Sequence, residues 1–190
     1  SVDISRVGGL AMKKAWFNAT DAEEARACLR RLAAQGILRI QQAATLGESL
    51  DRFWQALLGA VAVLNHGDLT LANALWWDGE VASLLDFEFA VIAPAELDFN
   101  GLVRIAFPPG GLGEGGSERL QQEVIRLAQP VLAHAGGGDL LRGYAILLEL
   151  WLLEDWLAHP EGEGPLESWD PYRRLLSLAD GQSGYLKLLL

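Results

Sequence analysis

Three oxygen-bearing side chains in the middle of the sequence could act together on a metal ion and a hydroxyl group. Asp68 ends a short His-Gly-Asp triplet, Asn73 follows five residues later, and Asp86 comes after a second apolar run. Mg²⁺ takes one or two protein oxygens and completes its shell with water and substrate phosphates. A carboxylate facing such a site can orient a substrate hydroxyl or accept its proton. The pattern therefore indicates metal-assisted chemistry on a hydroxyl group.

A β-hairpin between Asn73 and Asp86 would bring these two side chains together. The dipeptide Asp78-Gly79 is a favoured two-residue hairpin turn because both positions tolerate positive φ. With this turn at the tip, Asn73 falls opposite Leu84, and Asp86 lies two residues further along on the same face. Diagonal neighbours of this kind are about 7–8 Å apart, so we expect a shared cation. The strand-like runs cover residues 74–77 and 81–85.

The segment that contains these residues resembles the catalytic region of aminoglycoside phosphotransferases and of related small-molecule kinases such as choline kinases. Residues 66–73, HGDLTLAN, match the motif H-G-D-x-x-x-x-N, and residues 86–88, DFE, stand where the family has its D-x-D/E metal motif. Pro94 and the pair Leu97-Asp98 resemble the P-x-x-D-L segment of the family. The likeness is strongest over about 35 residues, from Leu64 to Asp98.

The resemblance implies a role for each matching residue. Asp68 would be the catalytic base or the group that orients the hydroxyl, while Asn73 and Asp86 would hold Mg²⁺ bridging the phosphates of ATP or GTP. Glu88 would be an auxiliary metal ligand. The implied reaction transfers the γ-phosphate to a hydroxyl group of a small acceptor, for which a cationic compound is one candidate.

The resemblance also implies that His66 and Asp98 support the loop structurally. It further implies the C-terminal lobe of a protein-kinase-like fold, and nothing before residue 60 has the pattern of the five-stranded sheet lobe that precedes it in such kinases. We therefore expect this chain alone to be inactive. The expected single domain, 1–190, has helices over 1–63, the catalytic loop, hairpin and metal motif over 64–100, and helices over 101–190.

The pattern of apolar residues independently predicts a mainly α fold with a small β-hairpin (α+β). Apolar residues at helical spacing predict helices at about 117–135, 139–158 and 170–179, and Pro130 should kink or end the first of these. Thr45 and Glu48 form a capping-box pattern, which predicts that a helix begins at Thr45.

Composition excludes several classes of partner. The net charge of −10 disfavours nucleic acid, and charges interrupt the most apolar segment, 140–157, which argues against a membrane span. Cys28 is the single cysteine, so no internal disulfide forms and a cytoplasmic location is expected. The acidic residues Glu149, Glu154 and Asp155 could line a pocket for a cationic acceptor.

Two other classes of function remain open at this point. The chain could be a non-catalytic helical binding module derived from a kinase lobe, with self-association through apolar surface that a sheet lobe would otherwise cover. A metal-dependent hydrolase that uses Asp68 and Asp86 is less favoured, because the sequence offers no His-rich ligand set of the kind that catalytic zinc needs.

Overall fold

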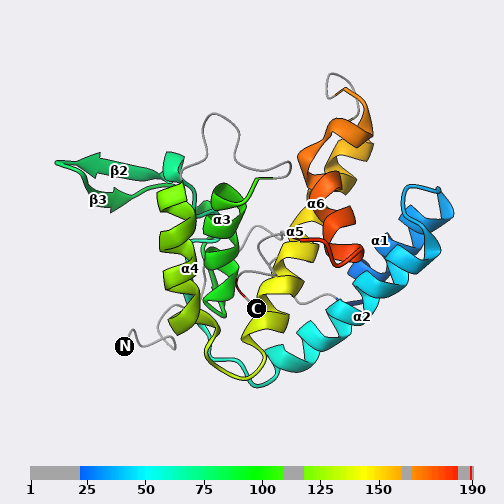
Figure 1. Ribbon diagram of the computed structural model, residues 1–190, viewed down its shortest axis with the longest axis horizontal. Coiled ribbons are helices and arrows are strands. Elements are labelled where there is room, and N and C mark those ends of the chain that lie inside the picture. Colours follow the sequence, from blue (N-terminus) through cyan, green and yellow to red (C-terminus); the bar gives the residue numbers. More distant parts are fainter. Residues whose placement is uncertain (1–21, 109–117, 160–163, 184–188, 190) are drawn as a thin grey trace.

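The computed structural model describes residues 22–108, 118–159, 164–183 and 189. This part of the chain is mainly helical with two small antiparallel sheets, which confirms the predicted fold class (Figure 1). The helices are α1 (Ala22–Ala34), α2 (Ile40–Leu57), α3 (Glu96–Ala106), α4 (Glu118–Leu132), α5 (Gly137–Ala158) and α6 (Asp170–Ala179). The strands are β1 (Val63–Asn65), β2 (Ala74–Trp77), β3 (Glu80–Leu84) and β4 (Val91–Ala93), and the short 3-10 turns are η3 (Leu71–Asn73), η4 (Phe87–Phe89) and η5 (Leu166–Ser168).

Helix α5 is the centre of the fold. It lies between the α3–α4 pair on one side and α1, α2 and α6 on the other (Figure 1). A helix that is apolar nearly all round must be covered on every side, and six of its leucine and isoleucine side chains are fully buried. These are Leu140, Leu141, Ile146, Leu147, Leu150 and Leu153. At Gly143 the missing side chain lets the Phe53 ring of α2 pack directly on the α5 backbone.

The helices predicted at 139–158 and 170–179 correspond closely to α5 and α6, whereas the helix predicted at 117–135 ends earlier, at Leu132. Helix α4 ends two residues after Pro130, as expected for a proline near a helix end. Helix α2 begins at Ile40 rather than at Thr45, and the Gln42 side-chain oxygen accepts a hydrogen bond from the Arg39 backbone N–H at 3.0 Å at this earlier start. The Thr45 hydroxyl lies inside the helix and donates a hydrogen bond to the carbonyl of Gln41. The described residues before β1 form α1 and α2, with no strand among them.

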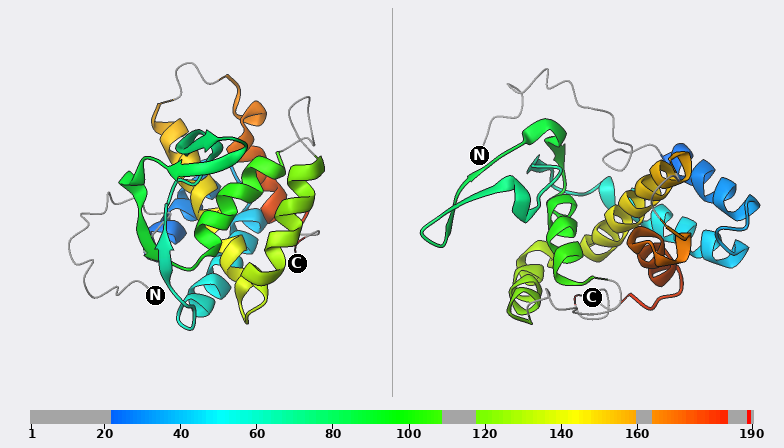
Figure 2. Two further views of the ribbon diagram at one scale, coloured as in Figure 1. Left: turned by 90° about the vertical axis from the view of Figure 1, so that its left-hand side faces the viewer. Right: turned by 90° about the horizontal axis from the view of Figure 1, so that it is seen from above.

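The hairpin of β2 and β3 projects away from the helices (Figure 2). Asp78 and Gly79 both have positive φ at its tip, as the turn requires. The predicted register is wrong beyond Trp76: a β-bulge at Ala82 adds one residue to β3, so Ala74, not Asn73, pairs with Leu84. The argument that placed Asn73 and Asp86 on one face by simple alternation therefore fails.

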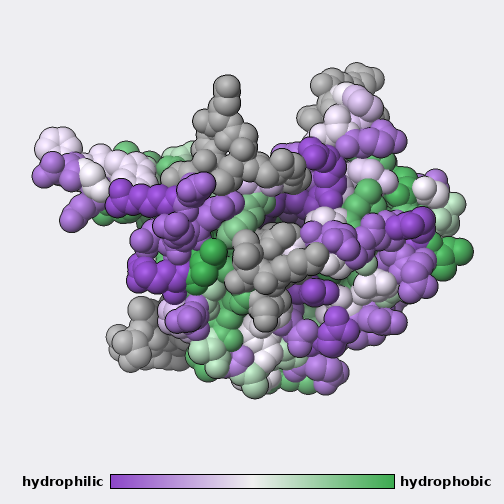
Figure 3. Space-filling model, viewed as in Figure 1, coloured by the Kyte–Doolittle hydropathy of each residue, from purple (hydrophilic) through white to green (hydrophobic). Residues whose placement is uncertain are grey.

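The exposed apolar side chains gather on the hairpin and on the strand that precedes it. The face in Figure 3 is a mixture of hydrophilic and hydrophobic residues, with hydrophobic areas near its centre and at its right-hand edge. The large apolar residues exposed here are Val61, Val63, Leu64, Leu75, Trp76, Trp77, Val81, Leu84 and Leu85. No helix among the described residues is long and apolar enough to cross a membrane.

Candidate active site

The loop that carries Asp68 starts from the two-stranded sheet of β1 and β4. Asn65, at the end of β1, is almost completely buried, and its side-chain nitrogen donates to the carbonyl of Ala93 on β4 at 2.7 Å. Its side-chain oxygen accepts a hydrogen bond from the Asp98 backbone N–H at 3.3 Å. Asn65 thereby ties the start of the loop to the first turn of α3.

The Asp98 carboxylate holds the next two residues of the loop. One of its oxygens accepts the backbone N–H of His66 at 2.6 Å, and the other accepts that of Gly67 at 2.9 Å. Gly67 has a φ of 84°, and a Cβ there would overlap the Phe89 carbonyl, so only glycine fits. Hydrogen bonds to a carboxylate are among the strongest available to a backbone amide, so the turn before Asp68 has one defined shape.

The His66 ring is buried and both of its nitrogens are engaged. Nε2 lies 2.6 Å from the Leu85 carbonyl oxygen, and the Asp68 backbone N–H donates to Nδ1 at 3.4 Å. A carbonyl only accepts, so the proton sits on Nε2 and Nδ1 is the acceptor. The ring also lies 4.6 Å, between centroids, from the Phe87 ring. His66 therefore joins the loop to the segment that carries Asp86.

Asp68 is exposed, and its carboxylate is oriented by Asn73. The Asn73 side-chain nitrogen donates to the Asp68 carboxylate at 3.0 Å and to the Asp68 carbonyl at 2.9 Å. The backbone of Asn73 accepts the N–H of Leu85 at 2.8 Å, which places Asn73 next to the residue that precedes Asp86. The structure thus brings Asp68 and Asn73 into direct contact and brings the Asp86 backbone close to them.

The residues predicted to bind metal offer oxygen donors that suit Mg²⁺. Because the Asn73 nitrogen faces Asp68, the amide oxygen is turned away and remains available to a ligand. Asp86 is exposed and adopts the left-handed conformation, with φ 58° and ψ 66°, immediately before η4, a conformation that aspartate tolerates. Glu88 is exposed on η4. One amide and one or two carboxylates are a chemically adequate set for a magnesium ion that keeps several waters and phosphate oxygens.

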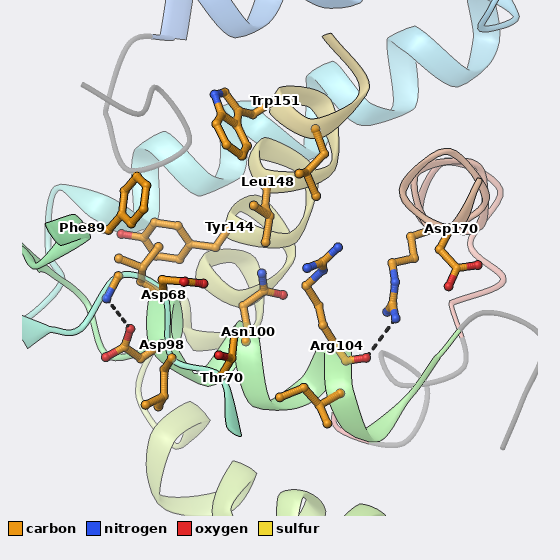
Figure 4. Close-up of a pocket in the computed structure, with 17 residues that line it drawn as sticks. Asp68, Thr70, Phe89, Asp98, Asn100, Arg104, Tyr144, Leu148, Trp151 and Asp170 are labelled. Carbon is orange, nitrogen blue, oxygen red and sulfur yellow. Dashed lines mark hydrogen bonds between the residues drawn. The ribbon is translucent and has the colours of Figure 1, made fainter. Parts of the chain in front are cut away.

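A cavity of about 410 Å³ opens beside Asp68. It lies between the Asp68 loop, α3 and the middle of α5, and Figure 4 shows the side chains that face it. Burial raises the pKa of the Tyr144 hydroxyl above its ordinary value, so this group stays protonated. The lining includes Asp68, Thr70, Phe89, Asn100, Arg104, Tyr144, Leu148, Trp151, Asp170 and Arg174.

An ion-pair network underlies the far end of the cavity. Glu149 of α5 is almost completely buried, and both of its oxygens accept from the Arg104 guanidinium, at 2.8 and 3.2 Å. Burial raises the pKa of the Glu149 carboxyl, while Arg104 opposes that rise. Arg174 donates to the backbone carbonyls of Phe107 and Arg104. The network fixes α3, α5 and α6 relative to one another.

The prediction that three acidic residues line a pocket for a cationic acceptor is wrong for this cavity. Glu149 points into the ion-pair network, because burial demands a cationic partner. Glu154 pairs with Arg31 of α1, and Asp155 lies beside His159 near the end of α5. None of the three is among the residues that line the cavity beside Asp68.

Comparison with known protein families gives a match. The model of the phosphotransferase enzyme family matches residues 2–146, which is most of the chain. The chain belongs to the phosphotransferase enzyme family. No curated protein and no solved structure matches.

Several residues around the Asp68 loop could not be identified from the sequence. Asn65 precedes the motif and gave no signal of its own. Asn100 and Arg104 are four residues apart, a spacing that places them on one face of α3, but nothing local showed that this face borders a cavity. Trp151 packs on the core and also lines the cavity.

The described residues contain no group of three or more His, Cys, Asp or Glu side chains placed to hold a metal ion. The alternative of a metal-dependent hydrolase built on Asp68 and Asp86 therefore finds no carboxylate or histidine cluster in this part of the chain. A magnesium ion held by an amide, one or two carboxylates and substrate phosphates needs no such cluster.

Proposed function

We propose that this chain serves phosphoryl transfer from ATP or GTP to a hydroxyl group of a small molecule in the cavity beside Asp68. The observation that carries the proposal is the position of Asp68. Its carboxylate is exposed at the edge of the cavity, and Asn73 orients it from one side while Asp98 and His66 fix the loop beneath it. Phosphoryl transfer depends mainly on such positioning and on stabilisation of charge.

In the proposed step the acceptor oxygen attacks the γ-phosphorus and forms a new P–O bond. The bond between that phosphorus and the oxygen bridging to the β-phosphate breaks, and the nucleoside diphosphate leaves with its electron pair. The acceptor's proton passes to the Asp68 carboxylate, which Asn73 holds in place. Asn73, Asp86 and Glu88 are proposed to hold Mg²⁺, which would neutralise charge on the phosphates.

The proposal also concerns which lobe of a kinase-like fold this chain forms. We propose that the described elements correspond to the C-terminal lobe of a kinase-like fold, as the family resemblance implies. The described residues ahead of β1 form helices α1 and α2, which supply no sheet to cover the nucleotide. We therefore expect slow or no transfer by this chain alone and faster transfer by the complete product of its gene.

The replacement Asp68→Asn tests the proposed role. Transfer of radiolabelled γ-phosphate is measured with Mg-ATP and a panel of aminoglycosides, choline and neutral glycosides, for this chain and for the complete gene product. Loss of the base should lower the rate by about 10²- to 10⁴-fold. Asp78→Asn, at the exposed tip of the hairpin, is the matched control and should leave the rate unchanged. Transfer that survives Asp68→Asn would exclude the role.

The exposed apolar hairpin favours a second candidate, a non-catalytic binding module. Trp76 and Trp77 are 54% and 79% exposed, which is unusual for large aromatic side chains outside an interface. If this candidate is correct, the complete gene product should transfer no phosphate, and Trp77→Ser should abolish its association in sedimentation velocity. An active enzyme whose sedimentation is unchanged by Trp77→Ser would rule the module out.

A further inference from the structure

The cavity beside Asp68 has an apolar wall. Tyr144, Leu148 and Trp151 occupy positions i, i+4 and i+7 of α5, so they form one stripe along the helix. Phe89 faces the cavity from the segment after the hairpin (Figure 4). An acceptor that fills this space must therefore present an apolar or ring-shaped surface to α5.

One polar atom in the cavity lacks a partner. Asn100 is only 2% exposed and lines the cavity, and its side-chain oxygen has no hydrogen-bond partner among the described residues. Figure 4 shows Asn100 beside Asp68, on the same side of the cavity. A buried oxygen without a donor is costly and rare in native proteins. A ligand N–H or O–H placed here would satisfy it.

The charged groups of the cavity do not suit a cation. Asp98 is engaged by two backbone amides of the loop, and Asp68 is the group that meets the reacting hydroxyl. Asp170 lies 3.5 Å from an arginine one turn further along its own helix. Two guanidinium groups, those of Arg104 and Arg174, also line the cavity. Both are engaged, Arg104 by Glu149 and Arg174 by backbone carbonyls. Apart from Asp68, the cavity therefore offers an acceptor with ammonium groups no carboxylate without a partner of its own.

We propose that the acceptor is an uncharged, ring-bearing hydroxyl compound, and that Asn100 determines specificity by accepting a hydrogen bond from it. The proposal rests on the proposed function, since it names the substrate class for the same site. It replaces the cationic acceptor expected from the sequence with a neutral one. Such an acceptor packs on the stripe of α5, donates to the Asn100 oxygen and presents a hydroxyl to Asp68.

Three isosteric probes test the proposal by binding to this chain in isothermal titration calorimetry. They are phenyl β-D-glucopyranoside, its 6-amino-6-deoxy analogue, which is cationic, and phenyl β-D-glucuronide, which is anionic. The neutral glycoside should bind at least about tenfold more tightly than the cationic analogue. Asn100→Leu should weaken the binding of the neutral glycoside by about tenfold, because the hydrogen-bond donor of the glycoside then faces a methyl group.

Two further measurements separate ligand recognition from a structural role of Asn100. Asn100→Leu should leave the melting temperature unchanged or raise it, because it removes a buried oxygen without a partner. Asn100→Asp keeps an acceptor atom and adds negative charge, so the preference should shift toward the cationic analogue. Tighter binding of the cationic analogue by the wild-type chain, no binding of the neutral glycoside, or unchanged affinity in Asn100→Leu would each overturn the proposal.

The outcomes for the two proposals are distinguishable. Binding of the neutral glycoside that depends on Asn100, without any transfer by the complete gene product, would refute the phosphotransfer and leave the acceptor class standing. Asp68-dependent transfer to an aminoglycoside, with no affinity for the neutral glycoside, would confirm the phosphotransfer and refute the acceptor class.

Discussion

Replacing Asp98 by asparagine tests how the Asp68 loop is held. The carboxylate accepts two backbone N–H groups, from His66 at 2.6 Å and from Gly67 at 2.9 Å. In Asp98→Asn one oxygen still accepts, but the new NH₂ group faces an N–H donor, so one charge-assisted hydrogen bond is lost. Such bonds contribute about 1.5–3 kcal/mol each, and the groups are partly buried. We therefore expect a loss of about 2 kcal/mol in the free energy of unfolding.

Urea denaturation followed by tryptophan fluorescence measures this loss. With an m-value of about 2 kcal/mol/M, the midpoint should fall by about 1 M while m stays constant. Asp78→Asn is again the matched control, because asparagine tolerates the positive φ of the exposed hairpin tip, and its midpoint should not move. A midpoint for Asp98→Asn that equals the wild-type value would show that Asp98 does not hold the loop.

Two further predictions concern stability away from the loop. Gly143→Ala should destabilise the chain by about 1–2 kcal/mol, because overlap of the new Cβ with the Phe53 ring outweighs the better helix propensity of alanine. An unchanged stability in thermal unfolding would contradict the tight packing of α2 on α5. The hydrogen bond from His134 to the buried Glu96 raises the pKa of the imidazole above 6.5. Folding therefore favours protonated His134. Its contribution to the free energy of unfolding is fully present below pH 6.5 and is lost as the pH rises through the higher pKa of the folded state. The difference in unfolding free energy between wild type and His134→Gln should accordingly shrink from acidic to alkaline pH, and a difference that grows with pH would refute the pairing.

The helices and the hairpin could be predicted because their signals are local. The period of apolar residues gave the helix at 170–179 with the bounds of α6, and a turn dipeptide with two positive φ angles gave the hairpin tip. The register of the hairpin could not be predicted, because no turn residue in the sequence marks the bulge at Ala82. The strands β1 and β4 were missed since three residues are too short for a period to appear.

The loop of the candidate site was identifiable from the sequence, whereas the cavity was not. Asp68, Asn73 and Asp98 lie within one segment of the sequence, so a sequence motif could identify them. The cavity takes its lining from that loop and from three helices that are distant in sequence. Asn100 carries no local mark of a ligand site, and only its burial without a partner reveals it.

Helix α3 both anchors the Asp68 loop and lines the cavity, which limits how the acceptor preference of this protein can evolve. Its first turn supplies Asp98, which shapes the loop, and the next turn supplies Asn100 and then Arg104 to the cavity. A backbone shift of α3 that admits a larger acceptor also moves the anchor of Asp68. New acceptor preferences can therefore evolve more freely through the partly buried side chains of α5 that line the cavity, such as Leu148 and Trp151. Changes in α3 risk the alignment of the Asp68 carboxylate.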